Sequence, residues 1–249
     1  GAVKNILSGT WLGHALRPAL SDVPIGAWVS AMLLDLFGDE ATDKAAQRLV
    51  GIGILAAVPT AASGLSDWAD TGGGQRRVGL VHASANTTSL LLYSSSWFAR
   101  RRGNRGLGAI FGFAGGGATL VGAYLGGHLS YAQGVGVDQT VFDEGPDDWS
   151  AVATEDELTD RAPKKVLVNS AGVLLYKDGD RIYAIASRCS HLGGPLEEGE
   201  IRDHSVVCPW HASAFSLADG AVIEGPARSP QPPYDVRARE GKIEIRVRT

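Results

Sequence analysis

The chain divides into two parts by its pattern of apolar and charged positions. Three segments contain no Asp, Glu, Lys or Arg, namely residues 49–66, 78–99 and 106–137. Each is long enough to cross the apolar layer of a membrane as a helix, which takes about 20 residues. A fourth segment, residues 20–38, is apolar in its middle and is bracketed by Asp22 and Asp35. The pattern predicts an all-α transmembrane four-helix bundle over residues 1–140.

The segment at residues 106–137 argues against a soluble bundle. Its glycines at positions 108, 112 and 116, and again at 122 and 126, recur four residues apart. Small residues at this spacing line one helix face and permit close helix contact in lipid. A soluble four-helix bundle would show a polar stripe along each helix, and the stretch LGAIFGFAGGGATLVGAYLGG has none. We therefore expect a packed membrane bundle.

The pattern changes after a short acidic linker at residues 141–148. Short β-rich runs follow, KKVLVNS, GVLLYKDG, RIYAIAS, SVVCPW and KIEIRVR, separated by turn signals such as Asp178-Gly179. The regular spacing predicts a small all-β domain over residues 149–249.

The distribution of charge supports this division and suggests an orientation. Residues 1–140 contain 18 charged side chains and residues 141–249 contain 32. The net charge of -4 gives no reason to expect a nucleic-acid partner. With four spans, six Lys and Arg lie in the two loops opposite the C-terminal domain and four lie on its own side. The positive-inside rule then predicts a multi-pass protein of the cell membrane with an extracytoplasmic β domain.

Four side chains in the β domain have the spacing of a metal site. Cys189 and His191 are separated by one residue, 16 residues follow, and Cys208 and His211 are separated by two. Two thiolates on one iron and two imidazoles on the other suit a two-iron, two-sulfur cluster of raised reduction potential. Zinc is the alternative, but zinc fingers usually pair Cys with Cys and His with His along the chain. Here the two types alternate.

These loops resemble the Rieske family, in the four ligands, in the GGPL after the first pair and in the stretch GPARSPQPPYDV, which resembles the third loop that covers the cluster. The CPWH sequence is similar to Rieske ferredoxins and oxygenases. The extra cysteine pair of the cytochrome bc proteins is absent, and Gly194 and Trp210 are among the residues in its loops. The resemblance places Trp210, Ser213 and Phe215 around the cluster. Ser213 matches a serine that hydrogen-bonds a cluster sulfur, and Phe215 replaces a tyrosine that makes a second such bond, so we expect a potential below that of the bc-type proteins.

The predicted topology brings three histidines of the first part, His14, His82 and His128, toward the face that carries the β domain. Ionisable side chains in a membrane are functional candidates; two imidazoles can hold a b-type haem, and three can bind a transition metal. The alternative is that each histidine lies at the interface and bonds water or a carbonyl. The segments GHALRPALSDVPIG, GLSDW, VHASAN and GGHLSYAQGVGV resemble an uncharacterised family of four-span membrane proteins, in which Arg17 replaces a second histidine of the first segment. His82 and His128 are therefore the preferred pair.

Together these features predict a membrane-anchored electron-transfer protein or oxidoreductase subunit rather than a stand-alone enzyme. It would relay electrons between a Rieske 2Fe-2S cluster and a haem or quinol at the bundle, with membrane lipid and a redox partner protein or quinol as its partners. Two alternatives remain open: an electron-transfer or assembly subunit of a larger respiratory complex with the bundle only as anchor, and a ferredoxin component serving an oxygenase. Association into a homo-oligomer also stays open. A Rieske oxygenase itself needs a mononuclear iron site in a following domain, for which the sequence up to Thr249 leaves no room.

Overall fold

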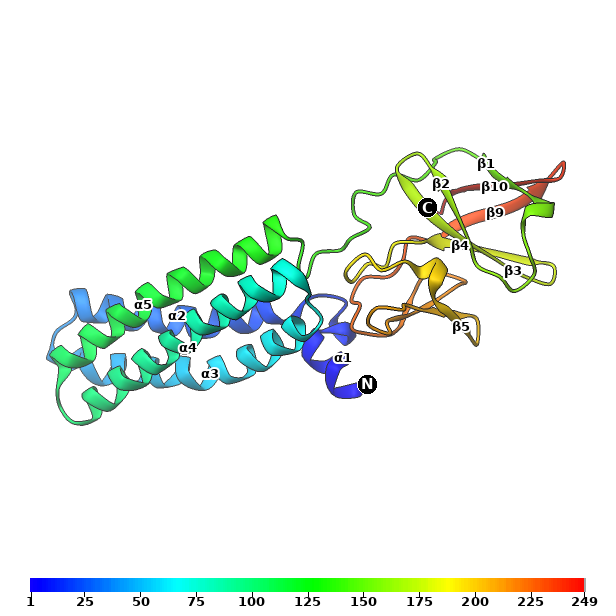
Figure 1. The fold of residues 1–249 in the computed structure, drawn as a ribbon. Coiled ribbons are helices and arrows are strands. Elements are labelled where there is room, and N and C mark those ends of the chain that lie inside the picture. The colour runs from blue at the N-terminus through cyan, green and yellow to red at the C-terminus, as the bar shows by residue number, and fades with distance from the viewer. Residues whose placement is uncertain (249) are drawn as a thin grey trace. The chain divides into compact units, whose positions relative to one another are not determined.

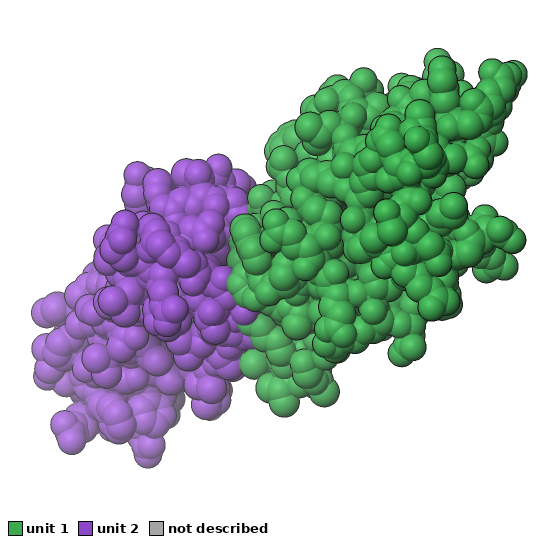
Figure 2. All heavy atoms as spheres, turned by 45° about the vertical axis from the view of Figure 1, so that its right-hand side comes forward, with its two compact units in different colours: residues 1–15, 136–249 green, residues 16–135 purple. Residues whose placement is uncertain are grey.

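The computed structural model describes residues 1–248, which form two compact units. The helical unit comprises residues 16–135, and the strand unit comprises residues 1–15 together with the chain from residue 136 onward. Figure 1 shows the elements and Figure 2 colours the two units. These limits differ from the predicted segments 1–140, 141–148 and 149–249, because the first residues of the chain contact a loop of the strand unit.

The strand unit contains three antiparallel sheets in the residues that the structure describes. The first sheet has the order β1 (Ser150–Thr154), β10 (Lys242–Val247), β9 (Tyr234–Arg239). The second has the order β2 (Lys164–Val168), β3 (Ala171–Asp178), β4 (Arg181–Ala186). The third has the order β5 (Glu200–Arg202), β6 (Ser205–Val207), β7 (Ala214–Ser216), β8 (Val222–Glu224). The prediction of an all-β domain is confirmed.

The five runs predicted as strands correspond to β2, β3, β4, β6 and β10. The predicted turn lies between β3 and β4, where Asp178 pairs with Arg181 and Gly179 has a φ of 60° that favours glycine. The strands missed from sequence are β1, β5, β7, β8 and β9. Most of them have only three to five residues, which is too short to establish an alternating pattern.

Two apolar cores hold these sheets together. One contains Ile243 and Ile245 of β10 with residues of β2, β3 and β4. The other contains Leu174, Leu196 and Phe215, and it also includes Cys189 and Cys208. The two cysteines therefore lie at the edge of a packed core, which fixes the loops that carry them.

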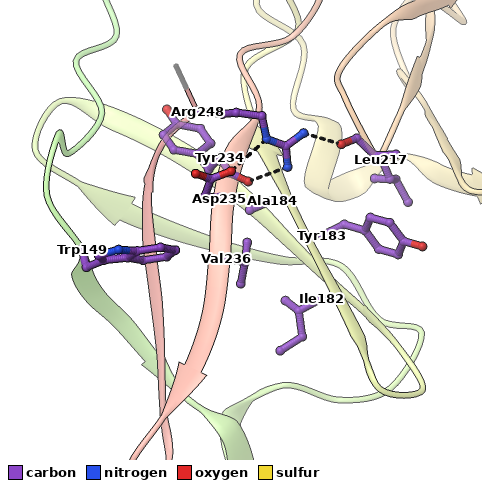
Figure 3. A pocket seen from close by; sticks show the side chains of 10 residues that line it. Trp149, Ile182, Tyr183, Ala184, Leu217, Tyr234, Asp235, Val236 and Arg248 are labelled. Carbon is purple, nitrogen blue, oxygen red and sulfur yellow. Dashed lines mark hydrogen bonds and ion pairs between the residues drawn. The ribbon is translucent and has the colours of Figure 1, made fainter.

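A hollow on the strand unit lies apart from the cysteine loops (Figure 3). Arg248 crosses it and donates to Asp235 Oδ1 at 3.1 Å and to the Ala218 carbonyl at 2.8 Å. The remaining lining residues are mostly apolar and include Trp149, Ile182, Tyr183, Leu217, Tyr234 and Val236. No lining residue belongs to the two predicted ligand loops.

The helical unit consists of α2 (Leu16–Phe37), α3 (Asp43–Ala69), α4 (Gly73–Arg101) and α5 (Arg105–Gly127), followed by the π-helical turn η3 (His128–Ala132). The 3-10 turn η2 (Glu40–Thr42) joins α2 to α3. Short connections make consecutive helices neighbours: α2 packs along α3, and α4 packs along α5. Asn104 caps α5 by accepting a hydrogen bond from the Leu107 amide at 3.0 Å.

The inside of the helical unit combines a small apolar core around Trp28 and Tyr93 with buried hydroxyl groups, and large apolar side chains cover its outside. Trp28 stacks on Tyr93 with ring centroids 4.1 Å apart, and a Cβ at Gly115 would come within 3.1 Å of the Tyr93 ring. Buried Ser89 and Ser96 donate to carbonyls of α5. Large side chains point outward instead, among them Val29, Leu33, Leu55, Val58, Leu91, Ile110, Leu120 and Val121. This arrangement is typical of a bundle that packs in lipid.

Three helical segments are long and apolar enough to cross a membrane, Leu16–Phe37, Glu40–Ala69 and Arg105–Ala132. The predicted span at residues 78–99 lies within α4. This helix is less apolar than the other three because it carries many Ser, Thr and Asn side chains. The helical N-terminal region and three of its spans are thus supported, and the count of four stays a prediction.

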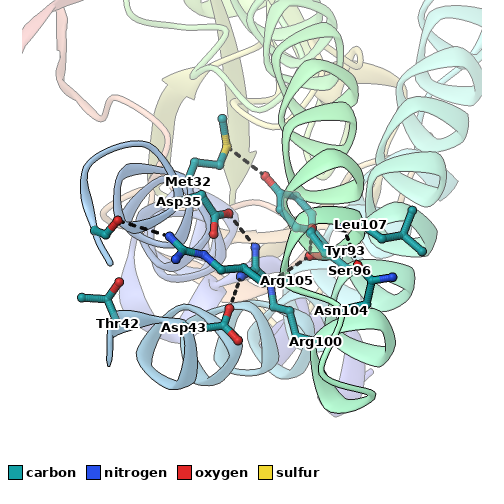
Figure 4. Close-up of polar contacts among 12 residues, drawn as sticks. Met32, Asp35, Thr42, Asp43, Tyr93, Ser96, Arg100, Asn104, Arg105 and Leu107 are labelled. Carbon is teal, nitrogen blue, oxygen red and sulfur yellow. Dashed lines mark hydrogen bonds and ion pairs between the residues drawn. The ribbon is translucent and has the colours of Figure 1, made fainter. Parts of the chain in front are cut away.

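One ion-paired cluster closes an end of the helical unit (Figure 4). The Arg100 side chain is fully buried and donates through Nη2 to Asp35 of α2 at 2.5 Å and through Nη1 to Asp43 of α3 at 3.0 Å. Its Nε contacts Ser96 Oγ at 3.3 Å. A Cβ at Gly108 would collide with the Arg100 side chain, so glycine makes the room that the guanidinium stem needs.

Candidate metal centre

The predicted ligands lie on two short loops closed by their own backbone hydrogen bonds. In the first, which follows β4, the Cys189 amide donates to the Gly194 carbonyl and the Gly193 amide donates to the Cys189 carbonyl, both at 2.8 Å. In the second, between β6 and β7, the Cys208 amide donates to the Ser213 carbonyl at 2.8 Å. Gly193 and Ala212 adopt left-handed φ values of 78° and 59° where these loops turn back.

The structure brings the four predicted ligands together as two pairs. The Cys189 and Cys208 side chains are hydrogen-bonded to one another and are buried. The His191 and His211 rings are perpendicular, with centroids 5.1 Å apart, and both residues are half-buried. Each loop thus contributes one thiol to the inner pair and one imidazole to the outer pair.

The thiol pair is electrostatically asymmetric. The hydrogen bond with the Cys208 side chain, and then burial, raise the pKa of Cys189. The same hydrogen bond lowers the pKa of Cys208 to about 6, and the backbone N–H groups of Trp210 and His211 act in the same direction. Amide donors aimed at a sulfur stabilise its negative charge. The second loop therefore stabilises the thiolate of Cys208, the form in which cysteine binds metal.

This donor set fits two iron atoms better than one ion. Among the residues that the structure describes, no three His, Cys, Asp or Glu side chains converge on the position of a single metal ion. A two-iron cluster of the mixed type needs only two protein ligands on each iron. Glycine at 194 also leaves space beside the thiols, since a Cβ there would lie 2.8 Å from Cys208 Sγ and 3.2 Å from the Trp210 ring.

The three residues expected around the cluster occupy different environments. Ser213 is fully buried, and its Oγ accepts the Ala227 amide at 2.9 Å. Phe215 is fully buried in the core that contains both cysteines. Trp210 lies beside Gly194 but is 55 % exposed, so it borders the site from the solvent side rather than enclosing it.

The stretch GPARSPQPPYDV lies against both ligand loops. Its Ala227 amide bonds Ser213 of the second loop, and its Ser229 carbonyl accepts Ser190 Oγ of the first loop at 2.7 Å. The side-chain amide of Gln231 is fully buried and reaches the Arg188 carbonyl and the Ser190 amide at 2.9 and 2.7 Å. Sequence reasoning did not identify Gln231, although a glutamine within a proline-rich stretch next to a buried strand was the available signal.

The predicted membrane histidines have local partners in the structure. His82 Nδ1 lies 2.8 Å from the Gly122 carbonyl of α5, and Asn86 Nδ2, one helical turn later, lies 3.1 Å from His82 Nε2. His128 is exposed at the start of η3, with its Nε2 3.2 Å from Gln133 Nε2. His14 is exposed in the strand unit, and its Nδ1 lies 3.2 Å from the Ala15 carbonyl.

Comparison with known proteins agrees with the geometry of the strand unit. Residues 148–235 match the Rieske 2Fe-2S domain. The chain is 35% identical over 97 residues to the 3-phenylpropionate/cinnamic acid dioxygenase ferredoxin subunit of Photorhabdus laumondii, which covers 39% of this chain and 91% of that protein. It is 28% identical over 100 residues to the anthranilate 1,2-dioxygenase ferredoxin subunit of Burkholderia cepacia, with 40% and 93% covered. The solved ferredoxin of carbazole 1,9a-dioxygenase from Nocardioides aromaticivorans IC177 is 30% identical, with a TM-score of 0.39 and coverage of 40% and 98%.

The strand unit is thus a Rieske-type iron-sulfur domain, and such a domain indicates a 2Fe-2S cluster. Residues 13–139, slightly more than half of the chain, match the family described as Predicted membrane protein (DUF2231), and the chain belongs to this family. The predicted fusion of a membrane domain with a Rieske domain is confirmed.

Proposed function

We propose that Cys189 and Cys208 bind one iron of the 2Fe-2S cluster, that His191 and His211 bind the other, and that the protein is a membrane-anchored electron carrier. The observation that carries this proposal is the pairing of the side chains, with thiol beside thiol and imidazole beside imidazole. Such a cluster, when bound, takes up and releases one electron at a time. The half-buried imidazoles are the ligands nearest to solvent, so electrons enter and leave on their side.

A redox partner exchanges these electrons at the membrane. The ferredoxin subunits to which the chain is similar belong by name to dioxygenases, which supports a protein partner. The membrane family adds a lipid environment, in which a quinol is the available small electron carrier. The two remaining roles differ only in the identity of this partner. It is a respiratory complex if the protein is a subunit of one, and an oxygenase if the protein serves as a ferredoxin.

The contacts of His82 argue against the haem version of this relay. A Cβ at Gly126 would come within 3.2 Å of His82 Cε1, and a Cβ at Gly122 would come within 2.7 Å of Asn86 Oδ1. Helices α4 and α5 therefore pack directly on one another at the histidine, and both of its ring nitrogens have polar neighbours. A haem ligand needs one ring nitrogen free for iron and space for the porphyrin. We favour a structural role for His82.

We propose α4 as the fourth membrane span. Its hydroxyl side chains bond carbonyls one turn earlier, as Ser84, Thr87, Ser94 and Ser95 do, or carbonyls of α5, as Ser89 and Ser96 do. Hydroxyls satisfied in this way are compatible with lipid. Four spans return the chain to its starting side.

The excess of Lys and Arg on the opposite side then makes the Rieske domain extracytoplasmic. Buried Arg100 is paired with Asp35 and Asp43, and the other five Lys and Arg of that side still outnumber the four on the Rieske side. A reporter that is active only outside the cytoplasm, fused after β10, is expected to be active. The same reporter inserted between α2 and α3 is the control, and activity of the control alone would reverse the orientation.

The test of the cluster is spectroscopic. The full chain, purified in detergent and reduced, is expected to give the paramagnetic-resonance signal of a Rieske cluster, and Cys208→Ser or His211→Ala is expected to lose it. His204→Ala is the matched control, because His204 is exposed and lies outside both ligand loops. An iron-loaded chain without the signal would overturn the proposal, and a haem band in the visible spectrum would restore the haem relay.

A further inference from the structure

The first residues of the chain form an element with two chemically different faces. Helix α1 (Ala2–Ser8) ends at Gly9, whose φ of 84° turns the chain into the 3-10 turn η1 (Thr10–Leu12). We call residues 2–12 the clasp. Its polar side contacts the strand unit, to which it belongs, and its apolar side does not.

The polar side of the clasp holds the loop that lies against both ligand loops. Thr10 Oγ1 donates to the Ala227 carbonyl at 3.0 Å, and Arg228 Nε donates to the Ser8 carbonyl at 2.5 Å. A Cβ at Gly225 would collide with the Thr10 side chain, so the two segments are in close contact. The amide of Ala227 in turn donates to Ser213 Oγ. Two hydrogen bonds in sequence, one from Thr10 to Ala227 and one from Ala227 to Ser213, therefore connect the clasp to the serine beside the predicted ligands.

The opposite side of the clasp is apolar and uncovered. Val3 and Ile6 lie three residues apart and therefore share a face of α1. The Trp11 indole donates to the Ile6 carbonyl at 3.3 Å, which holds the ring against the end of that helix. Val3, Ile6, Trp11 and Leu12 are 71 %, 58 %, 66 % and 48 % exposed, and the only charged side chain of the clasp is Lys4.

We propose that this apolar side is embedded in the interface of the lipid bilayer. The helix Leu16–Phe37, which has the composition of a membrane span, begins four residues after Leu12. Four residues reach at most about 14 Å, so Leu12 lies within that distance of the end of the span. Tryptophan is enriched at this depth, which suits Trp11.

The consequence concerns the cluster-bearing domain. Because the clasp binds the bilayer on one side and the loop at Ala227 on the other, it tethers this domain to the membrane surface through a second point besides the linker. The domain then stays at one depth beside the bilayer, where a lipid-soluble or membrane-bound partner reaches it. This inference rests on the proposed membrane anchoring and not on the cluster.

Spin labels test the lipid contact. The full chain is reconstituted in phosphatidylcholine and phosphatidylglycerol vesicles, with a label on Ile6→Cys or Trp11→Cys. The parent chain, treated with the same label, gives the background signal of the native cysteines. Labels at 6 and 11 are expected to be relaxed more by oxygen than by a water-soluble nickel chelate. The control Leu167→Cys, 75 % exposed on β2, is expected to show the reverse. Labels at 6 and 11 that behave like the control would overturn the proposal. Broadening between labels that disappears on dilution with unlabelled protein would also overturn it, because it would mean that a second copy covers this side.

A second measurement tests the attachment. A label on exposed Pro230→Cys, in the loop that the clasp holds, is expected to gain a mobile component in Thr10→Val and to keep the parent spectrum in Thr10→Ser, which retains the hydroxyl. An unchanged spectrum in Thr10→Val would overturn the tether. The cluster signal is recorded on the same samples. If that signal is absent while the lipid contact is retained, the result contradicts the proposed cluster function and leaves the membrane contact of the clasp supported.

Discussion

The hydroxyl of Ser213 offers the sharpest test of how the protein sets the properties of its cluster. Ser213 is fully buried, and its oxygen already accepts the Ala227 amide at 2.9 Å. Since a hydroxyl has one proton to donate, that proton is directed to a different acceptor. Beside the thiol pair, the proposed acceptor is a cluster sulfur. Ser213→Ala removes both the donor and the acceptor without adding volume.

The size of the expected effect follows from the charge of the acceptor. A hydrogen bond to a charged group contributes roughly 1.5–3 kcal/mol. For a one-electron couple, about 59 mV corresponds to a tenfold change in the equilibrium constant and hence to about 1.4 kcal/mol. A donor that acts mainly on the reduced, more negative cluster therefore raises the potential by roughly 60–130 mV, and Ser213→Ala is expected to lower it by that amount.

The same substitution has a separate effect on folding. It leaves the buried Ala227 amide without its acceptor, which costs about 1–3 kcal/mol. Ser205→Ala is the matched control, because Ser205 is also buried and donates to the Arg202 carbonyl at 2.6 Å on another turn. We expect the control to lose stability but to keep the potential, measured by redox titration of the cluster signal. A potential in Ser213→Ala equal to that of the control would refute the assigned hydrogen bond.

Three further predictions concern other parts of the molecule. Phe215→Tyr restores the missing donor and is expected to raise the potential in the same titration, whereas a lowered potential would contradict the comparison with bc-type proteins. Gly194→Ala places a methyl group 2.8 Å from Cys208 Sγ and is expected to reduce the iron bound per chain, so full iron content would contradict the fit of the site. Arg100→Met leaves two carboxylates unpaired and is expected to destabilise the helical unit by about 3–5 kcal/mol in thermal unfolding in detergent, while the exposed Arg102→Met is expected to change little.

The loops that carry the four predicted ligands could be recognised from sequence because their motifs depend on local spacing. Cys189 with His191, and Cys208 with His211, lie on loops whose own backbone bonds close them. The longer strands could be predicted for the same reason, because their alternation is visible within a few residues. The arrangement of the four ligands as two pairs required the loops to be folded against each other.

Other features depend on contacts that no local pattern encodes. Thr10 and Ala227 are separated by 217 positions in the chain, and nothing in the sequence around either residue indicates their hydrogen bond. The resemblance places Trp210 around the cluster, and the exposure of this residue, 55 %, depends on how the folded turn presents it. The membrane histidines were grouped by a predicted common face, whereas the structure gives His82 and His128 separate polar neighbours.

The buried ion pair at the end of the helical unit has a consequence for how the protein is made. Asp35 is synthesised 65 residues before Arg100, its partner in the finished bundle. During synthesis α2 and α3 emerge before Arg100, so Asp35 and Asp43 lack the guanidinium that balances them in the finished unit. This end of the helical unit is therefore completed only when α4, the third of the four long helices, has been made.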